Sequence, residues 1–392
     1  MKALVIKYSF LAVVVALFLY SYTQVDLSLT LSQVSIWQII QKNFQQIGWF
    51  NRPLSTLLFV SITALMFAYY IWFLKKAWSK QIKIKEVWVL VIVTSVILAL
   101  SYNAFSYDLF NYIFDAKIVT HYHQNPYLHR ALDFPGDPML SFMQWTHRLY
   151  PYGPVWLGLT VPLSFAGMNF FLLTFFLFKF MIAGFYLGTV YLIYKINERI
   201  NPQHALLNTV FFAMNPLVII ESLVSSHSDI VMIFFAILGI YLFFLKKKIL
   251  AIIAIIVSSQ VKIPTIALIL PMVLSFSLLK LKLDNSRFVQ LCVLTMLASF
   301  LYVLTKIEIQ PWYFLWLLPF ISLLKPNKYI FAGTVGLSLG LLLRYLVFIY
   351  FGNWGGIGVP LRNSLTIISP IVLVLIVLVY TKSKSLIRAI SS

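Results

Sequence analysis

Ionisable side chains gather in one stretch of this otherwise apolar sequence, SYDLFNYIFDAKIVTHYHQNPY. If the stretch is a helix capped by Ser106, four polar residues share one face: Asp108, Asn111, Tyr112 and Asp115. A carboxyl group directly after an apolar segment is partly desolvated, so its pKa rises unless a cation or hydrogen bonds keep it ionised. Asp108 is therefore a candidate general base that could take a proton from a hydroxyl group. The alternative is a solvated loop acid, or a carboxylate that caps a neighbouring helix.

A second cluster lies in NPLVIIESLVSSHSDIVM, where Glu221, His227 and Asp229 fall near the end of a predicted helical hairpin. Ionisable groups at membrane depth are costly and by default indicate function, but these three could equally form a polar turn that faces water. Lys262 and Arg362 are cations beside apolar helix ends. Each could bind a phosphate, pair with an acid such as Glu221, or extend its charged group to the lipid headgroups.

Histidines and aromatic residues of the outer segments give weaker signals. His121 and His123 could share a metal with an aspartate, but histidines in loops are more often exposed. No metal ligand set is predicted, and a role for Mg²⁺ or Mn²⁺ stays open. Tyr127 and Tyr152 suit the aromatic belt of a membrane protein, and they equally suit stacking against a sugar.

The composition indicates a membrane protein: 61% of the residues are hydrophobic and 10% are charged, against about 25% charged in soluble domains. Apolar runs long enough to cross ~30 Å of hydrocarbon recur along the chain. We therefore expect an all-α, polytopic transmembrane bundle that forms a single domain over residues 1–392. About twelve spans are predicted, near 8–23, 54–74, 86–103, 169–194, 205–223, 229–245, 249–261, 264–279, 288–305, 312–324, 329–350 and 364–381.

Two long outer loops, 24–53 and 104–168, separate these spans. The first has apolar residues at helical spacing and could form an amphipathic surface helix. In the second, YGPVWLGLTVPLSFAG is expected to be a re-entrant or interfacial segment, broken by Pro154 and Pro162. The N-terminal apolar segment is expected to stay as the first helix rather than to be cleaved. Lys179 and Arg344 lie in mid-span, where pairing with acids or tyrosines is the default.

The net charge of +19 follows the topology and does not indicate a nucleic-acid partner. Of the 30 basic residues, 20 lie at the termini or in alternate loops, which the positive-inside rule assigns to the cytoplasm. Both termini are then cytoplasmic, and the acidic clusters face outward. These basic residues are Lys2, Lys7, Lys75, Lys76, Lys80, Lys83, Lys85, Lys195, Arg199, Lys246, Lys247, Lys248, Lys280, Lys282, Arg287, Lys325, Lys328, Lys382, Lys384 and Arg388.

Five segments, in this order, resemble the GT-C superfamily of integral-membrane glycosyltransferases, and in particular its polyprenol-phosphate-mannose-dependent mannosyltransferases. They are SYDLFNYIFDAKIVTHYHQNPY, YPYGPVW, NPLVIIESLVSSHSDIVM, VKIPTIALILP and QPWYFLWLLPF. The family places its catalytic acid in an outer loop just after a transmembrane helix, and Asp108 matches that position. Many relatives carry a second acid two residues earlier, where this chain has Ser106.

The resemblance implies an inverting glycosyltransferase. The basic, lysine-rich sequence and the lack of organelle signals lead us to expect a prokaryotic plasma membrane. The enzyme would move a sugar, mannose by the family likeness, from a polyprenyl phosphate to a glycolipid, glycan or protein acceptor. Asp108 would be the base, and the donor phosphate would meet Lys262, Arg362 and His227. The expected substrate-binding residues are Asp115, Asn125, Tyr127, Tyr152, Glu221, Asp229, Gln310 and Trp312. The alternative is a lipid or sugar transporter or flippase, which would favour ionisable groups at the midplane and internal repeats.

Overall fold

The computed structural model describes residues 2–276 and 284–390, with side chains for 6–275 and 284–383. Within these ranges the chain is helical and contains no strand, as predicted. Six helices are long and apolar enough to cross a membrane. They are α1 (Lys2–Thr23), α3 (Arg52–Trp78), α7 (Phe171–Ile200), α13 (Asn285–Leu304), α15 (Lys328–Phe351) and α16 (Gly358–Ile390).

Shorter helical pieces occupy the positions of the other predicted spans. They are α4 (Ile84–Ala99), α8 (Ala205–Ala213), α9 (Pro216–Ile219), η5 (Ile220–Val224), α10 (Asp229–Phe244), α11 (Lys248–Ser259), η6 (Ile263–Leu268), α12 (Ile269–Phe276), η7 (Pro311–Trp316) and α14 (Leu318–Ile321). By length and composition the described chain has six candidate spans, or seven if the pieces from α8 to η5 count as one. The predicted number of about twelve is therefore not confirmed. Apolar runs mark where helices lie, but prolines such as Pro264 and Pro311 at helix starts shorten them.

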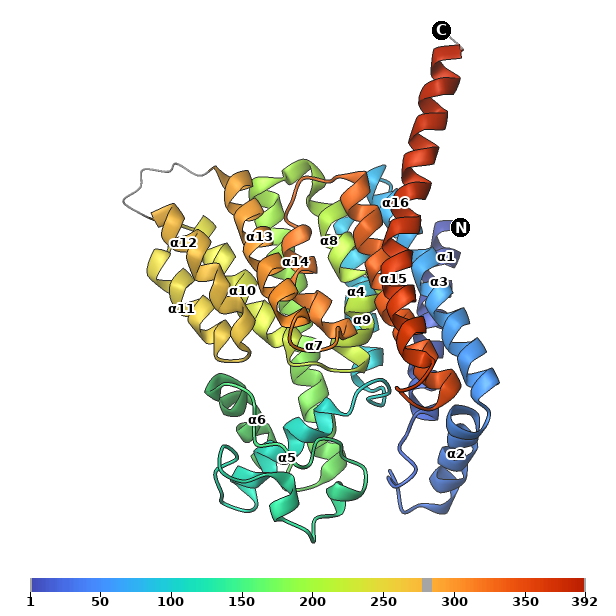
Figure 1. The fold of residues 1–392 in the computed structure, drawn as a ribbon, viewed down its shortest axis with the longest axis vertical. Helices are drawn as coiled ribbons and strands as arrows, with labels where there is room; N and C mark the ends of the chain where they lie inside the picture. Colours follow the sequence, from blue (N-terminus) through green and yellow to red (C-terminus); the bar gives the residue numbers. More distant parts are fainter. Residues whose placement is uncertain (1, 277–283, 391–392) are drawn as a thin grey trace.

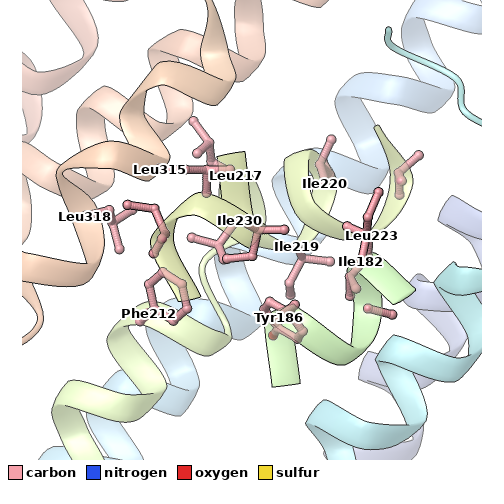
Figure 2. Close-up of a cluster of buried hydrophobic side chains, with 14 of the residues drawn as sticks. Ile182, Tyr186, Phe212, Leu217, Ile219, Ile220, Leu223, Ile230, Leu315 and Leu318 are labelled. Carbon is pink, nitrogen blue, oxygen red and sulfur yellow. The ribbon is translucent and has the colours of Figure 1, made fainter. Parts of the chain in front are cut away.

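The broken helix from α8 to η5 is the centre of the core. Its two halves meet at an angle of 55°, and Asn215 begins the second half by accepting a hydrogen bond from the Leu217 backbone. Figure 2 shows Leu217, Ile220 and Leu223 of this segment among buried side chains of α7 and of the η7–α14 region. Apolar packing on all sides therefore fixes the bend, and the residues that follow it are directed by a rigid element.

Two groups of helices lie at one end of the bundle, the bottom of Figure 1. The predicted loop 24–53 contains α2 (Ser35–Gln45) and η1 (Gln46–Phe50), and the loop 104–168 contains α5 (Asp108–Thr120), η2 (Ala131–Asp133), η3 (Pro138–Ser141) and α6 (Pro154–Ala166). As predicted, α2 is an amphipathic surface helix, with Ile36, Trp37 and Ile39 all more than half exposed.

The segment expected to be broken by two prolines is one continuous helix, α6. Pro154 occupies its first turn, where a missing N–H costs nothing, and Pro162 lies inside it. The prediction that Pro154 and Pro162 break this segment is therefore wrong. The start of α6 is joined to the end of α11, because the Val155 backbone donates to the Gln260 carbonyl at 3.2 Å. A Cβ at Gly153 would lie 2.1 Å from the same carbonyl oxygen, so only glycine fits this junction.

The basic connections meet away from α5 and α6. Trp78 at the end of α3 stacks with His204 after α7, and the Arg199 guanidinium lies over the ring of Tyr241 in α10. These contacts place three of the basic connections side by side. Five basic residues of the predicted pattern lie outside the described side chains: Lys2, Lys280, Lys282, Lys384 and Arg388.

Helices α15 and α16 pack closely along their length. A Cβ added at Gly336 would lie 2.5 Å from the Pro370 backbone, and one at Gly340 would lie 2.6 Å from the Leu365 carbonyl oxygen. The outer face of α16 is open, since only 6% of its most apolar window is buried. Close contact through glycine brings the polar side chains of these two helices together.

Candidate active site

His227 lies between two carboxylates. Its Nδ1 is 3.4 Å from Asp108 Oδ2, and its Nε2 is 3.3 Å from Glu221 Oε2. Neither contact has hydrogen-bond geometry, so the ring is held by charge and packing. His227 and Glu221 are fully buried, whereas 17% of the Asp108 side chain is exposed. The alternative of a polar turn that faces water is therefore excluded. Of the three side chains, Asp108 is the one that a substrate can reach.

Local backbone features bring Glu221 and His227 to this place. Glu221 lies in the π-helical turn η5, and Ser226 in the turn before His227 has a φ of +51°. Non-glycine residues rarely adopt that φ. Strained residues and π-helical turns both concentrate at functional sites. On the other side, Ser106 Oγ accepts a hydrogen bond from the Asp108 backbone at 3.1 Å. The N-cap residue of α5 is Tyr107, whose side chain makes no capping hydrogen bond, so the predicted cap lies one residue too early.

Aromatic side chains pack against His227 and Glu221. The Trp312 ring stacks on the imidazole of His227, with centroids 4.1 Å apart, and the Tyr345 hydroxyl donates to Glu221 Oε1 at 3.0 Å. Trp312 was among the predicted substrate-binding residues; the structure places it against His227. Tyr345 carries no sequence signal, since tyrosines are frequent in this chain.

Lys179 supports the same turn from α7. The side chain is buried, and its Nζ donates to the Val224 carbonyl at 3.0 Å and to Ser101 Oγ at 3.1 Å. The expectation that Lys179 pairs with an acid or a tyrosine is wrong. Carbonyl groups at the end of a helix lack an intrahelical donor, and the one at the end of η5 accepts the lysine instead.

Electrostatics keep Asp108 and His227 charged. Burial alone would raise the pKa of Asp108, but His227, with the charges of Lys262 and Arg148, holds that pKa below its ordinary value. Burial alone would lower the pKa of His227, but the two carboxylates raise it to about 9. At neutral pH Asp108 is therefore a carboxylate and His227 an imidazolium.

A second ion pair lies beside it. Lys262 Nζ is 2.6 Å from Asp229 Oδ2, and the Trp316 indole donates to the other oxygen of Asp229 at 2.6 Å. Asp229 is fully buried, and 14% of the Lys262 side chain is exposed. The ammonium of Lys262 also lies over the ring of Tyr152, 5.3 Å from its centroid. Lys262 thus pairs with an acid, as one sequence interpretation expected, and the acid is Asp229 rather than Glu221.

Arg362 belongs to a third cluster, on α15 and α16. Its Nε and Nη2 donate to the two oxygens of Glu308 at 2.7 and 2.9 Å, and Arg344 also donates to Glu308. The expectation that Arg344 pairs with an acid is confirmed. Partial burial would raise the pKa of Glu308, but the two guanidinium groups hold it below its ordinary value.

The polar face of α5 continues beyond Asp108. Asp115 follows two turns later, about 10 Å along the helix axis, and burial raises its pKa to about 8. Asn111, between the two acids, has a buried side-chain oxygen without a hydrogen-bond partner. The Tyr112 hydroxyl accepts a hydrogen bond from Ser228 Oγ at 3.2 Å, and its ring meets Tyr152 edge to face.

Other predicted residues lie outside these clusters. Asn125 caps a surface turn by accepting from the Tyr127 backbone at 3.0 Å, and the Tyr127 hydroxyl donates to the Tyr152 carbonyl at 3.1 Å. Gln310 precedes η7 and is partly exposed. His121 and His123 are exposed. Within the described residues, no group of three His, Cys, Asp or Glu side chains is arranged to hold a metal ion.

Several residues of the clusters were missed from sequence: Ser228, Glu308, Tyr313, Trp316 and Tyr345. Trp316 and Tyr313 lie in QPWYFLWLLPF beside the predicted Trp312, so their helical spacing was a usable signal. Glu308 lies 36 positions before Arg344 in the chain, so no local pattern indicates that the two side chains pair.

We expect the stability of the protein to depend on the protonation of His227. Its pKa is about 9 in the folded state against ~6.5 in an unfolded chain. The stabilisation is therefore fully present below pH ~6.5 and is lost as the pH rises through 9. The loss is on the order of 3 kcal/mol, because one pKa unit corresponds to about 1.4 kcal/mol. Thermal unfolding midpoints of wild type and His227→Gln, followed from pH 6 to 10, should converge at high pH; parallel curves would contradict the assignment.

A family model described as the N-terminal domain of alpha-(1->6)-mannopyranosyltransferases matches residues 11–278. The match covers more than half of the chain and includes Asp108, Glu221, His227, Asp229 and Lys262. No curated protein matches the chain, and no solved structure does.

Proposed function

The chain belongs to the alpha-(1->6)-mannopyranosyltransferase family, of the GT-C type, and from this we propose that it transfers mannose from a polyprenyl phosphate to an acceptor hydroxyl. The observation that supports the proposal best is Asp108, a partly exposed carboxylate held ionised by a buried imidazolium. A carboxylate that is ionised and accessible can take a proton from an acceptor hydroxyl. The acceptor is a glycolipid, a glycan or a protein.

In the proposed reaction, the acceptor oxygen attacks the anomeric carbon of mannose. The bond from that carbon to the phosphate oxygen breaks, and the polyprenyl phosphate leaves with the electron pair. Asp108 takes the proton of the acceptor hydroxyl, which is general-base catalysis. Because one displacement inverts the anomeric carbon, an α-linked product requires a β-linked donor.

Lys262 is the group that we assign to the leaving phosphate. Its ammonium is partly exposed and influences Asp108, whereas His227 is fully buried under Trp312. Stabilising the charge that develops on a leaving group is usually the largest single catalytic term. In this proposal His227 holds Asp108, and Lys262 meets the phosphate.

An apolar groove offers a place for the lipid tail of the donor. It has a volume of about 360 Å³ and is lined by Ala267, Leu270, Thr295, Ala298, Ser299 and Tyr302. Ala267 lies in η6, the helical turn that begins directly after Lys262. A phosphate on Lys262 would therefore carry its prenyl chain along η6 and into this groove.

The polar face of α5 would bind the acceptor sugar. Asn111 and Asp115 continue that face for about 10 Å beyond Asp108, and Tyr152 lies near by. Carboxyl, amide and aromatic groups are the usual partners of sugar hydroxyls and ring faces. Asn125, Tyr127, Asp229, Glu221 and Gln310 would then support this surface rather than contact the reacting atoms.

The orientation follows from the basic loops. If these are cytoplasmic, then α5, α6 and Asp108 lie at the outer face of a prokaryotic plasma membrane and both termini are cytoplasmic.

The test is donor cleavage by the purified full-length protein in lipid. Polyprenyl phosphates carrying radiolabelled mannose, glucose or galactose would be offered with extracted membrane glycolipids and glycans. We expect label from mannose alone to appear in an acceptor. Transfer of another sugar would overturn the assignment of mannose as the donor sugar. Movement of intact labelled donor across the bilayer without transfer would favour a flippase.

A further inference from the structure

Two buried arginines share one carboxylate at the ends of α15 and α16. Arg344 and Arg362 are 2% and 4% exposed, whereas the Glu308 side chain is 42% exposed. The cluster therefore carries one uncompensated positive charge in a largely buried place. Burying a charge without a partner is costly, so a second anion would stabilise this cluster.

The guanidinium groups also have free hydrogen-bonding capacity. Arg344 donates to Glu308, Asn363 and Thr366, and Arg362 donates twice to Glu308 and once to the Trp354 carbonyl. In the described structure each thus makes three hydrogen bonds, whereas a guanidinium has five N–H groups. Asn363, Thr366 and Trp354 would hold both arginines in place if Glu308 moved away.

The surroundings favour a lipid. Apolar side chains around the cluster are exposed: Ile307, Trp354, Ile357 and Leu361 are between 41% and 73% accessible. A free anion would gain nothing from these side chains. A phosphate attached to a lipid would bind the guanidinium groups, while its tail covers the apolar surface. Arginine pairs suit phosphate because their planar groups donate bidentately.

We propose that Arg344 and Arg362 form a binding site for a lipid-linked phosphate, and that Glu308 occupies this site until the lipid arrives. The inference stands apart from the proposed transfer reaction. The lipid is a membrane phospholipid, bound by its headgroup phosphate, because the donor phosphate is assigned to Lys262. Glu308 lies between α13 and η7, in a connection that can move away from the arginines without unfolding either helix.

The experiment measures binding to the full-length protein in zwitterionic nanodiscs, without any transfer. The probes are farnesyl phosphate, phosphatidic acid and inorganic phosphate. Removing the internal competitor by Glu308→Gln should tighten lipid-phosphate binding by about tenfold, ~1.4 kcal/mol. Arg362→Lys, which keeps the charge but loses the bidentate geometry, should weaken it. Glu86→Gln, which removes a carboxylate paired with Lys7 elsewhere, should change nothing.

If the Glu308 ion pair served only the structure, Glu308→Gln would weaken lipid-phosphate binding or leave it unchanged. Either result would overturn the proposal. Inorganic phosphate bound as tightly as the lipids would also overturn it. Tightening for phosphatidic acid is the expected result, and tightening for farnesyl phosphate alone would overturn the assignment to a phospholipid. Lipid binding at this site does not depend on Asp108. If Asp108→Asn still transferred mannose, the proposed reaction would be overturned, but the binding result would stand.

Discussion

Replacement of Asp108 by asparagine should reduce mannosyl transfer by about 10²- to 10⁴-fold, the usual contribution of a general base. Asparagine has nearly the same shape but cannot accept the proton of the acceptor hydroxyl. Donor binding should persist, because Lys262 and the groove beside η6 are untouched. The measurement is single-turnover transfer of labelled mannose, together with binding of the donor in the absence of acceptor.

The matched control is Asp133→Asn. Asp133 is another carboxylate of the same outer loop, it pairs with the exposed Arg130, and its side chain is 34% exposed. Its replacement should leave transfer within about twofold, as for most surface substitutions away from special features. If Asp108→Asn retained the wild-type rate, Asp115 would become the candidate base, because its pKa of about 8 suits proton abstraction near neutral pH.

Replacement of Lys262 by methionine should produce two separable losses. The first is catalytic: removing a group that stabilises charge on the leaving phosphate should cost about 10²- to 10³-fold in rate. The second is structural: Asp229 would keep a buried, unpaired carboxylate, a defect that typically costs about 3–5 kcal/mol. Rate and thermal unfolding midpoint should therefore both fall.

A second substitution separates the two losses. In Lys262→Met with Asp229→Asn, no buried charge is left unpaired, and the asparagine can still accept from the Trp316 indole. The unfolding midpoint should recover, while the transfer rate should stay low. Recovery of the rate together with the midpoint would show that Lys262 serves only to neutralise Asp229.

The sequence predicted the helical class better than the number of spans, and it singled out several residues that the structure brings together. Asp108 at the start of α5 could be found because a helix start and a change in polarity are local signals. Lys262 could be found because cations are scarce beside outer helix ends. In each case the informative feature lay within a few residues.

The pairings could not be found in the same way. Glu308 meets Arg344 and Arg362 across different helices, and His227 meets Asp108 across more than a hundred positions of the chain. Such contacts depend on the 55° bend before η5 and on the close glycine packing of α15 against α16. Neither has a distinctive local pattern, since Asn-Pro and isolated glycines occur in many ordinary helices.

The short helices have a consequence for the bilayer itself. Helices α10 and α11 have 16 and 12 residues, and at 1.5 Å per residue they are about 24 and 18 Å long, less than the ~30 Å of a hydrocarbon layer. Lipids adjust to such a mismatch by local thinning. Headgroups beside these helices would then lie closer to the midplane, so that the membrane helps to deliver a carrier-bound sugar to Asp108. We expect transfer to be faster in vesicles of shorter acyl chains, and a rate independent of chain length would exclude this contribution.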